Sequence, residues 1–165
     1  MADIPEPHPS MPNLRLRRAA ATDVPAVHAL VTAAYQHYVP RVGRKPGPML
    51  VGYDAILPLP AHRVWVLEDG HTIVALLHII LKSDHVVVEN LAVAPSHQGH
   101  KSGGWLMRLA EDEAQRGGVY EMRTYTHELM VENQAIYARL GYEETDRRVE
   151  DGFARVFLRK RLGRI

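Results

Sequence analysis

Apolar and polar positions alternate at the start of the chain and then take up a longer period. Residues 14–17 read Leu-Arg-Leu-Arg, which is the two-residue period of a half-buried strand. A helix is then expected from Thr22 or Asp23, either of which could serve as its N-cap ahead of Pro25. It should run to about Tyr38, and its buried face is expected to hold Val24, Val27, Leu30, Val31 and Ala34.

The next segment breaks this helical pattern. Residues 39–48 contain three prolines and two glycines, so we expect an ordered loop there. The loop also carries Arg41, Arg44 and Lys45, which make it the most basic stretch of the chain. A short helix is expected at 49–57, where Pro58 follows and ends it.

Strand-like runs occupy the middle of the chain. Residues 63–67, 72–82 and 85–93 are rich in β-branched and other apolar side chains, and short polar turns separate them. They predict an antiparallel meander of three neighbouring strands. A polar, glycine-bearing stretch at 95–104 then leads into a helix whose apolar positions are Leu106, Leu109, Ala110 and Ala114.

The remaining pattern completes the predicted fold. Gly117 and Gly118 stop the helix, and the later elements are a strand at 122–126, a helix at 132–140 and a hairpin of 142–149 and 153–159. The predicted class is therefore α/β (α+β), with a mixed, mostly antiparallel sheet of six to seven strands flanked by about four helices.

Composition narrows the range of functions. The 165 residues suit one domain, which we place at 14–165 after a flexible proline-rich tail at 1–13. A formal charge of +1 is too balanced for a nucleic-acid binder, and no apolar run is long enough to span a membrane. The tail has no apolar core like that of a secretion signal, so we expect a cytoplasmic protein. The absence of cysteine excludes disulfides, thiolate metal sites and a cysteine nucleophile.

Residues 89–105 are the most informative segment. A buried strand, a polar loop rich in backbone N–H groups and a helix start follow one another, which favours a phosphate or pyrophosphate site. A glycine-rich turn that binds nothing is the plain alternative. A Walker loop, a nucleophile elbow and a dinucleotide fingerprint all fail, because Pro95 and His100 stand where glycines are needed and the preceding strand belongs to a meander.

Two motifs resemble those of the GNAT acyltransferases. Gln98-Gly-His-Lys-Ser-Gly103 is similar to the family's acetyl-CoA loop, Gln/Arg-x-x-Gly-x-Gly/Ala, with Lys101 in place of the first glycine. Residues 125–142 resemble the family's strand, loop and helix that end in Tyr-x-x-x-Gly-Phe/Tyr, here Tyr137 to Tyr142. The family's pantetheine-binding Asn would fall at Met130, and the nearest Asn is Asn133.

The resemblance implies an acetyl-CoA-dependent N-acetyltransferase that moves acetyl directly to a primary amine of a small molecule or peptide. Glu89 would be the general base, directly or through water, and Tyr137 would donate a proton to the coenzyme A sulfur. The implied cosubstrate-binding residues are Leu91, Ala92, Val93, Gln98, Gly99, His100, Lys101, Ser102, Gly103, Gly104, Asn133 and Tyr137. Acceptor-binding residues are expected among Tyr35, Tyr38, Arg41, Arg44, Tyr53 and Asp54.

Other interpretations stay open at this point. Glu89 could form a surface ion pair and Tyr137 could be ordinary core, and the protein could be a non-catalytic acyl-CoA sensor or a phosphate-binding protein. No metal is expected, because His97 and His100 lack a third ligand nearby. The basic loop would suit an acceptor with a carboxylate or phosphate near its amine. The acceptor's identity, the acyl length and the choice between monomer and homodimer stay open.

Overall fold

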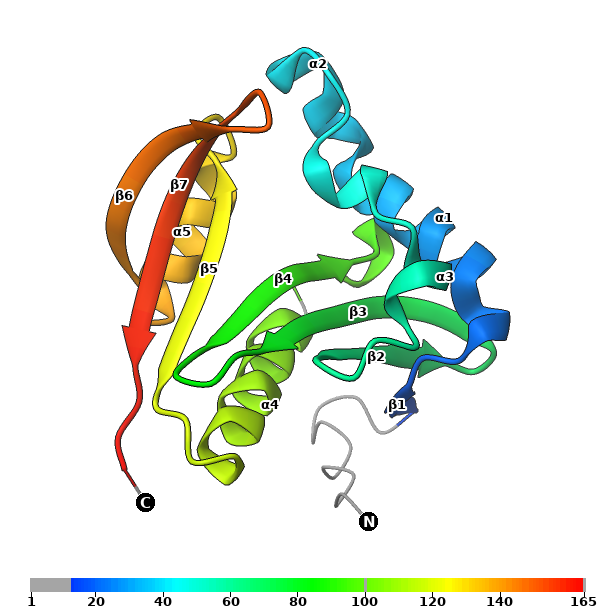
Figure 1. Ribbon diagram of the computed structural model, residues 1–165. Coiled ribbons are helices and arrows are strands. Elements are labelled where there is room, and N and C mark those ends of the chain that lie inside the picture. The colour runs from blue at the N-terminus through cyan, green and yellow to red at the C-terminus, as the bar shows by residue number, and fades with distance from the viewer. Residues whose placement is uncertain (1–12, 100, 165) are drawn as a thin grey trace.

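A seven-stranded sheet organises the computed structural model, which describes residues 13–99 and 101–164 (Figure 1). The strands lie in the order β1-β2-β3-β4-β5-β7-β6. Their bounds are β1 Leu14–Arg18, β2 His62–Asp69, β3 Thr72–Leu81, β4 Val86–Val93, β5 Glu121–His127, β6 Glu143–Glu150 and β7 Phe153–Arg161. All neighbours are antiparallel except β4 and β5, so the predicted mixed, mostly antiparallel sheet is confirmed.

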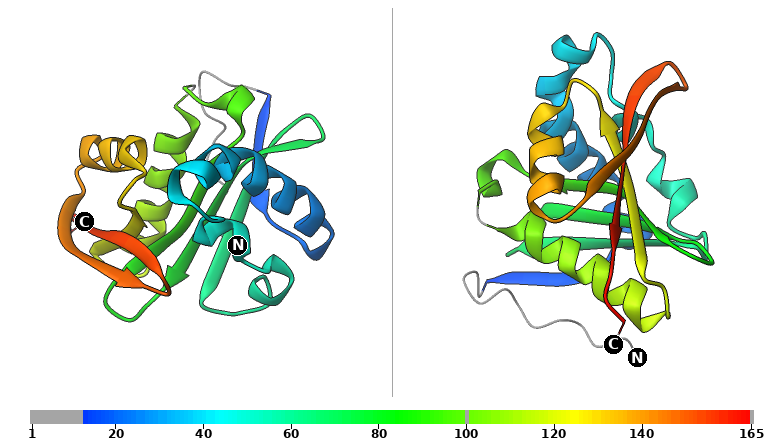
Figure 2. Two further views of the ribbon diagram at one scale, coloured as in Figure 1. Left: turned by 90° about the horizontal axis from the view of Figure 1, so that it is seen from above. Right: turned by 90° about the vertical axis from the view of Figure 1, so that its left-hand side faces the viewer.

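Helices cover both faces of this sheet. The longer ones are α1 (Val24–Tyr35), α4 (Ser102–Arg116) and α5 (Val131–Arg139), and α2 (Val39–Val42) and α3 (Tyr53–Ile56) are single turns. Figure 2 shows α1 and α4 on opposite faces. Neighbouring residues of β2 accordingly point to opposite faces of the sheet. Val64 and Val66 pack in the core beneath α1, and Trp65 and Leu67 pack in the core beneath α4.

The segment between α1 and β2 differs from the prediction. The first helix ends at Tyr35 and continues as a 3-10 turn to Tyr38, and residues 39–42, predicted as loop, form α2. Pro40 is compatible with α2 because it stands in the first turn, where its missing N–H has no partner to lose. The helix predicted at 49–57 is wrong in extent, because extended backbone at Val51 and Gly52 separates a 3-10 turn (Gly47–Leu50) from α3.

The centre of the sheet opens between β4 and β5. These two parallel strands pair only from Val86 to Val88 opposite Met122 to Thr124. Beyond that point β4 stays paired with β3 and β5 stays paired with β7, and the two groups of strands separate (Figure 1). Glu89 is an extra residue in β4 at this position, since His78 faces Asn90 while the next residue of β3 faces Val88. A bulge of this kind bends a strand and re-aims its side chains.

A buried histidine lies beside the bulge. His78 is 1% exposed, its Nε2 is 2.8 Å from Nδ1 of His62, and its Nδ1 has no hydrogen-bond partner within the described residues. Burial, and to a lesser degree the neighbouring His62, lowers the pKa of His78 to about 4.

This histidine should make the free energy of unfolding depend on pH. Its pKa is lower in the folded protein than in the unfolded chain, so the unfolded chain binds more protons between about pH 6.5 and pH 4. The contribution of His78 is complete above that window and decreases as the pH falls through it, by about 3 kcal/mol. Urea unfolding of the wild type and a His78→Gln variant at several pH values measures it.

The variant should show a shallower fall in unfolding free energy over this window than the wild type. A His28→Gln variant is the control for the substitution itself, because the side chain of His28 is exposed. Equal slopes for wild type and His78→Gln would contradict the assignment.

Candidate active site

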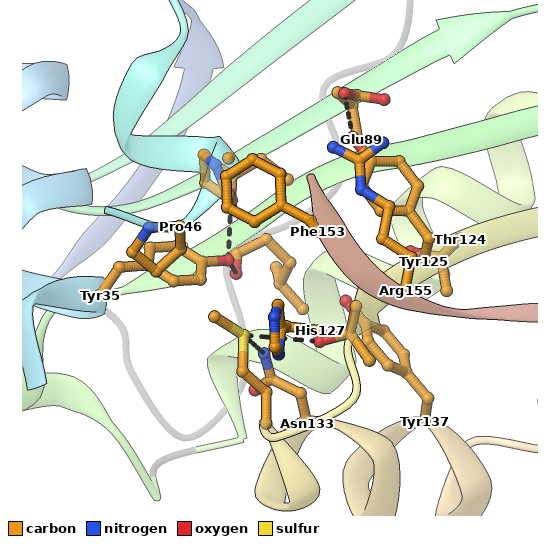
Figure 3. Close-up of a pocket in the computed structure, with 16 residues that line it drawn as sticks. Tyr35, Pro46, Glu89, Thr124, Tyr125, His127, Asn133, Tyr137, Phe153 and Arg155 are labelled. Carbon is orange, nitrogen blue, oxygen red and sulfur yellow. Dashed lines mark hydrogen bonds between the residues drawn. The ribbon is translucent and has the colours of Figure 1, made fainter. Parts of the chain in front are cut away.

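The opening between β4 and β5 contains a small cavity and an adjoining groove. Glu89, Tyr125, His127, Phe153 and Arg155 are among the residues that line the cavity (Figure 3). The groove is larger, about 700 Å³, and runs along the start of α4 and one side of α5. Both are lined by Tyr35, Leu91, Asn133 and Tyr137, so the cavity and the groove meet at these residues.

Backbone amides of β4 face this opening. The carbonyl of Leu91 accepts a hydrogen bond from Tyr35 Oη at 3.2 Å, and that of Val93 accepts one from the side chain of Gln98 at 3.0 Å. Since N–H and C=O of one strand residue point the same way, the amides of Leu91 and Val93 also point away from β3. Ala92 lies between them in the alternation, so its backbone faces β3 and its side chain is buried.

The loop before α4 adopts the backbone conformation that its glycines allow. Gly99 has φ 83°, and Lys101, directly before α4, has φ 64°, a left-handed conformation that ordinarily favours glycine. A glycine, which the resembled acetyl-CoA loop has at the position of Lys101, would adopt this left-handed backbone without strain. Ser102, Gly103 and Gly104 form the first turn of α4 and line the groove, and His100 lies outside the described residues. The positive end of the helix dipole and the Lys101 ammonium both favour an anion here.

Glu89 projects from the bulge into the wall of the cavity. Its Oε1 accepts a hydrogen bond from the hydroxyl of Tyr125, on the facing strand. Burial, and then the Glu89 carboxylate, raises the pKa of Tyr125. The guanidinium of Arg155 lies 4.5 Å from the centre of the Tyr125 ring and forms an ion pair with Glu150 at 2.7 Å.

A buried polar cluster holds β4 directly after Glu89. The side-chain oxygen of Asn90 accepts a hydrogen bond from Tyr35 Oη at 2.8 Å, and its nitrogen donates to Tyr53 Oη at 2.9 Å. Burial raises the pKa of Tyr53 to about 12, so the hydroxyl stays protonated at neutral pH. Because the Tyr35 hydroxyl also donates to the carbonyl of Leu91, the cluster fixes both the bulge and a residue that lines the groove.

Tyr137 stands where the groove meets the cavity. It is 8% exposed, and burial raises its pKa above the ordinary value, with an opposing hydrogen-bond contact to Thr124. Asn133, one helical turn earlier, donates from its side chain to the sulfur of Met130 at 3.8 Å. Met130 itself is buried, so of these two residues Asn133 supplies the polar group that lines the groove.

The predicted acceptor residues are dispersed. Tyr35 lines both the cavity and the groove, whereas Tyr38 lines only the groove and Tyr53 lies behind Asn90. Asp54 lies in a separate groove beside the start of α1. The arginines are used within the protein, Arg41 in an ion pair with Glu132 at 2.7 Å, and Arg44 with its guanidinium carbon 3.8 Å from the centre of the Phe153 ring.

Several lining residues have no counterpart among the predicted ones. Tyr125, His127, Phe153 and Arg155 belong to strands whose burial pattern suggests only sheet structure, and Asn90 looked like one polar residue in a strand. The pKa of His127 is lowered chiefly by burial, and its Nδ1 accepts the N–H of Leu129 at 3.0 Å. A polar residue at an otherwise buried strand position was the available signal for Asn90.

Residues 13–99 and 101–164 present neither a metal site nor a membrane-spanning helix. Within these ranges no three His, Cys, Asp or Glu side chains are grouped so that they could hold a metal ion. No helix in the same ranges has the length and apolar character to cross a membrane.

Solved structures share this fold. The ribosomal-protein-S18-alanine N-acetyltransferase from Escherichia coli superposes with a TM-score of 0.73 and 18% identity over 92% of this chain and 96% of its own. PaiA N-acetyltransferase from Thermoplasma acidophilum, in complex with coenzyme A, superposes with a TM-score of 0.68 and 14% identity over 90% of this chain and 98% of its own. A GNAT family acetyltransferase from Elizabethkingia anophelis, with acetyl-CoA bound, superposes with a TM-score of 0.64 and 15% identity over 91% of this chain and 99% of its own. At these identities the likeness shows the fold.

Sequence comparison shows the family. No curated protein matches the sequence. The family model of the acetyltransferase (GNAT) domain matches residues 60–144, just over half of the chain, and this stretch includes Glu89, the loop before α4 and Tyr137. The expectation of an acyltransferase is confirmed, and the chain belongs to the GNAT acetyltransferase family.

Proposed function

We propose that the protein transfers acetyl from acetyl-CoA to a primary amine by direct attack. The observation that carries this proposal is the meeting of the groove and the cavity at Tyr35, Leu91, Asn133 and Tyr137. A thioester entering along the groove would end at this junction, and an amine in the cavity would face it. Two neighbours of the fold have coenzyme A or acetyl-CoA bound, which supports acetyl-CoA as the cosubstrate.

The groove supplies groups suited to coenzyme A. The pyrophosphate would lie at the first turn of α4, where Ser102, Gly103 and Gly104 present backbone N–H groups and Lys101 adds positive charge. The pantetheine arm would follow the amides of Leu91 and Val93, with the side chain of Asn133 on the opposite wall. In this arrangement the Leu91 amide also polarises the thioester carbonyl.

The cavity supplies groups suited to the transfer. The amine nitrogen forms a bond to the acetyl carbon, the carbon–sulfur bond breaks, and two proton movements complete the reaction. Glu89 accepts the proton that the amine loses, directly or through water, and Tyr137 gives a proton to the departing thiolate. The raised pKa of Tyr137 keeps its proton in place until the sulfur becomes charged.

The loss of the Tyr137 hydroxyl should slow turnover without loss of coenzyme A binding. We expect Tyr137→Phe to lower kcat about 10²-fold, as removal of a positioned acid does, and to leave affinity within a few fold. Thiol release measures kcat and calorimetry measures binding. Tyr142→Phe is the control, because Tyr142 is also buried, packs 5.6 Å from Tyr137, and has a hydroxyl with no partner in the described residues. Equal rates for the two variants would remove Tyr137 from the mechanism.

Replacement of Glu89 should affect amines according to their basicity. Freeing a lysine-like amine of its proton at pH 7 costs about 4.6 kcal/mol, but an α-amine costs only about 1 kcal/mol. Glu89→Gln should therefore lower the rate about 10²-fold with butylamine and less with an α-amine. The control is Glu121→Gln, whose carboxylate pairs with Arg123 outside the cavity. Rates near wild type with both amines would assign the proton to another group.

The same measurements distinguish the enzyme from a non-catalytic acyl-CoA sensor. Lys101 at a glycine-favouring position and Met130 at the family's Asn position are the two observations that favour a protein that binds acyl-CoA without using it. Binding of acetyl-CoA with no thiol release over a panel of amines would support the sensor and reject the enzyme.

A further inference from the structure

The cavity on the acceptor side is small, and two segments from distant parts of the chain help to line it. Its volume is about 40 Å³, against about 700 Å³ for the groove that it adjoins. Residues 43–48 and the hairpin turn at 151–153, which we call the roof, border one side of the cavity through Pro46, Gly47, Pro48 and Phe153. Figure 3 shows Pro46 and Phe153, one from each segment, beside Tyr35.

The two segments of the roof are in close contact although they are far apart in the sequence. The Arg44 guanidinium carbon lies 3.8 Å from the centre of the Phe153 ring, the distance of a stacked cation–π pair. A Cβ atom on Gly152 would come within 2.7 Å of Arg44 Nη1, so the turn leaves no space between them. A Cβ on Gly47 would be 3.5 Å from Arg155 Nη2, which is ordinary contact.

A second contact fixes the basic segment across the opening. Arg41 Nη1 donates to the carbonyl of Leu129 at 3.2 Å and to the carboxylate of Glu132 at 2.7 Å. Leu129 and Glu132 flank the start of α5, on the far side of the opening from α1. The segment from Arg41 to Pro48 therefore spans the gap between the two halves of the sheet, as Figure 1 shows for α2 and the tip of the hairpin.

The charges around the cavity suit an amine without an acidic group. Glu89 is the carboxylate of its wall and would attract an ammonium ion. Arg155, the guanidinium of its wall, is paired with Glu150 at 2.7 Å, and Arg44 is stacked on Phe153. Two of the three cationic side chains of the basic loop are thus engaged in holding the roof, and the carboxylate- or phosphate-bearing acceptor that its sequence suggests would compete with these internal contacts.

We propose that the acceptor is a compact primary amine that carries no other charged group and binds entirely beneath the roof. In this proposal Arg44 and Phe153 exclude the N-termini of peptides and proteins. This inference rests on the proposed function. A peptide would have to pass its second and later residues through the roof while its amine reached Glu89. Selection by length therefore follows from a contact between two segments and needs no residue that recognises the acceptor's body.

Two amides of one amino acid test this selection. Glycinamide and hexaglycinamide present the same reacting α-amine and differ in length, so basicity cannot explain a difference between them. We expect kcat/KM of the wild type to be about 100-fold higher for glycinamide, the effect of a steric obstacle at the site. Arg44→Ala and Phe153→Leu should each raise the hexaglycinamide-to-glycinamide ratio about tenfold.

The chain offers a matched control. Arg148 also places its guanidinium carbon 3.8 Å from a phenylalanine ring, that of Phe157, on the same hairpin but outside the cavity lining. Arg148→Ala should leave the ratio and both rates at wild-type values. In hydrogen exchange, Arg44→Ala should speed exchange of the amides in the non-proline residues of 43–48, and Arg148→Ala should not.

The outcomes are distinguishable. Equal wild-type efficiency on the two amides, a ratio unchanged in both roof variants, or unchanged exchange in residues 43–48 would each overturn the acceptor assignment and leave the enzyme standing. Transfer to no amine at all, with acetyl-CoA bound, would reject the proposed function and the acceptor assignment with it.

Discussion

The separation of β4 from β5 after three paired residues is the constraint on which the site depends. Parallel strands that stayed paired would use the amides of Leu91 and Val93 in the sheet, and no groove would reach its centre. Because β4 keeps its pairing with β3, the strand remains rigid while its other edge is exposed to the opening. Among the described residues, the protein thus presents backbone donors that pair with no neighbouring strand, in a fixed geometry, which is the usual way to bind an extended, amide-bearing ligand.

The polar cluster around Asn90 explains how the opening is maintained. An amide buried at 3% exposure is costly unless its hydrogen bonds are satisfied, and here Tyr35 and Tyr53 satisfy one on each side. Tyr35 comes from α1 and Tyr53 from α3, so both helices are locked to β4 beside the bulge. The direction of Glu89 is therefore set by contacts that involve no acceptor and no coenzyme A.

The basic loop illustrates how charged side chains can serve contacts within a protein. Arg41 and Arg44 suggested an anionic acceptor, yet one pairs with Glu132 and the other stacks on Phe153. Both contacts join segments that lie far apart in the chain, and both hold α2 and its loop over the opening. In this protein these two charged side chains therefore help to set the shape of the site through contacts within the chain.

The sequence by itself determined the strands, the long helices and the loop before α4, because hydrophobic period and glycine position are local properties of the chain. Resemblance to the family's motifs pointed to Glu89, Tyr137 and the first turn of α4 as candidates, all within the family match. Tertiary structure decided the rest. The contact of Tyr125 with Glu89 depends on the register between β4 and β5, and the contact of Arg44 with Phe153 depends on where a hairpin closes. Neither register nor closure is encoded in a local period, since both arise from packing between segments distant in sequence.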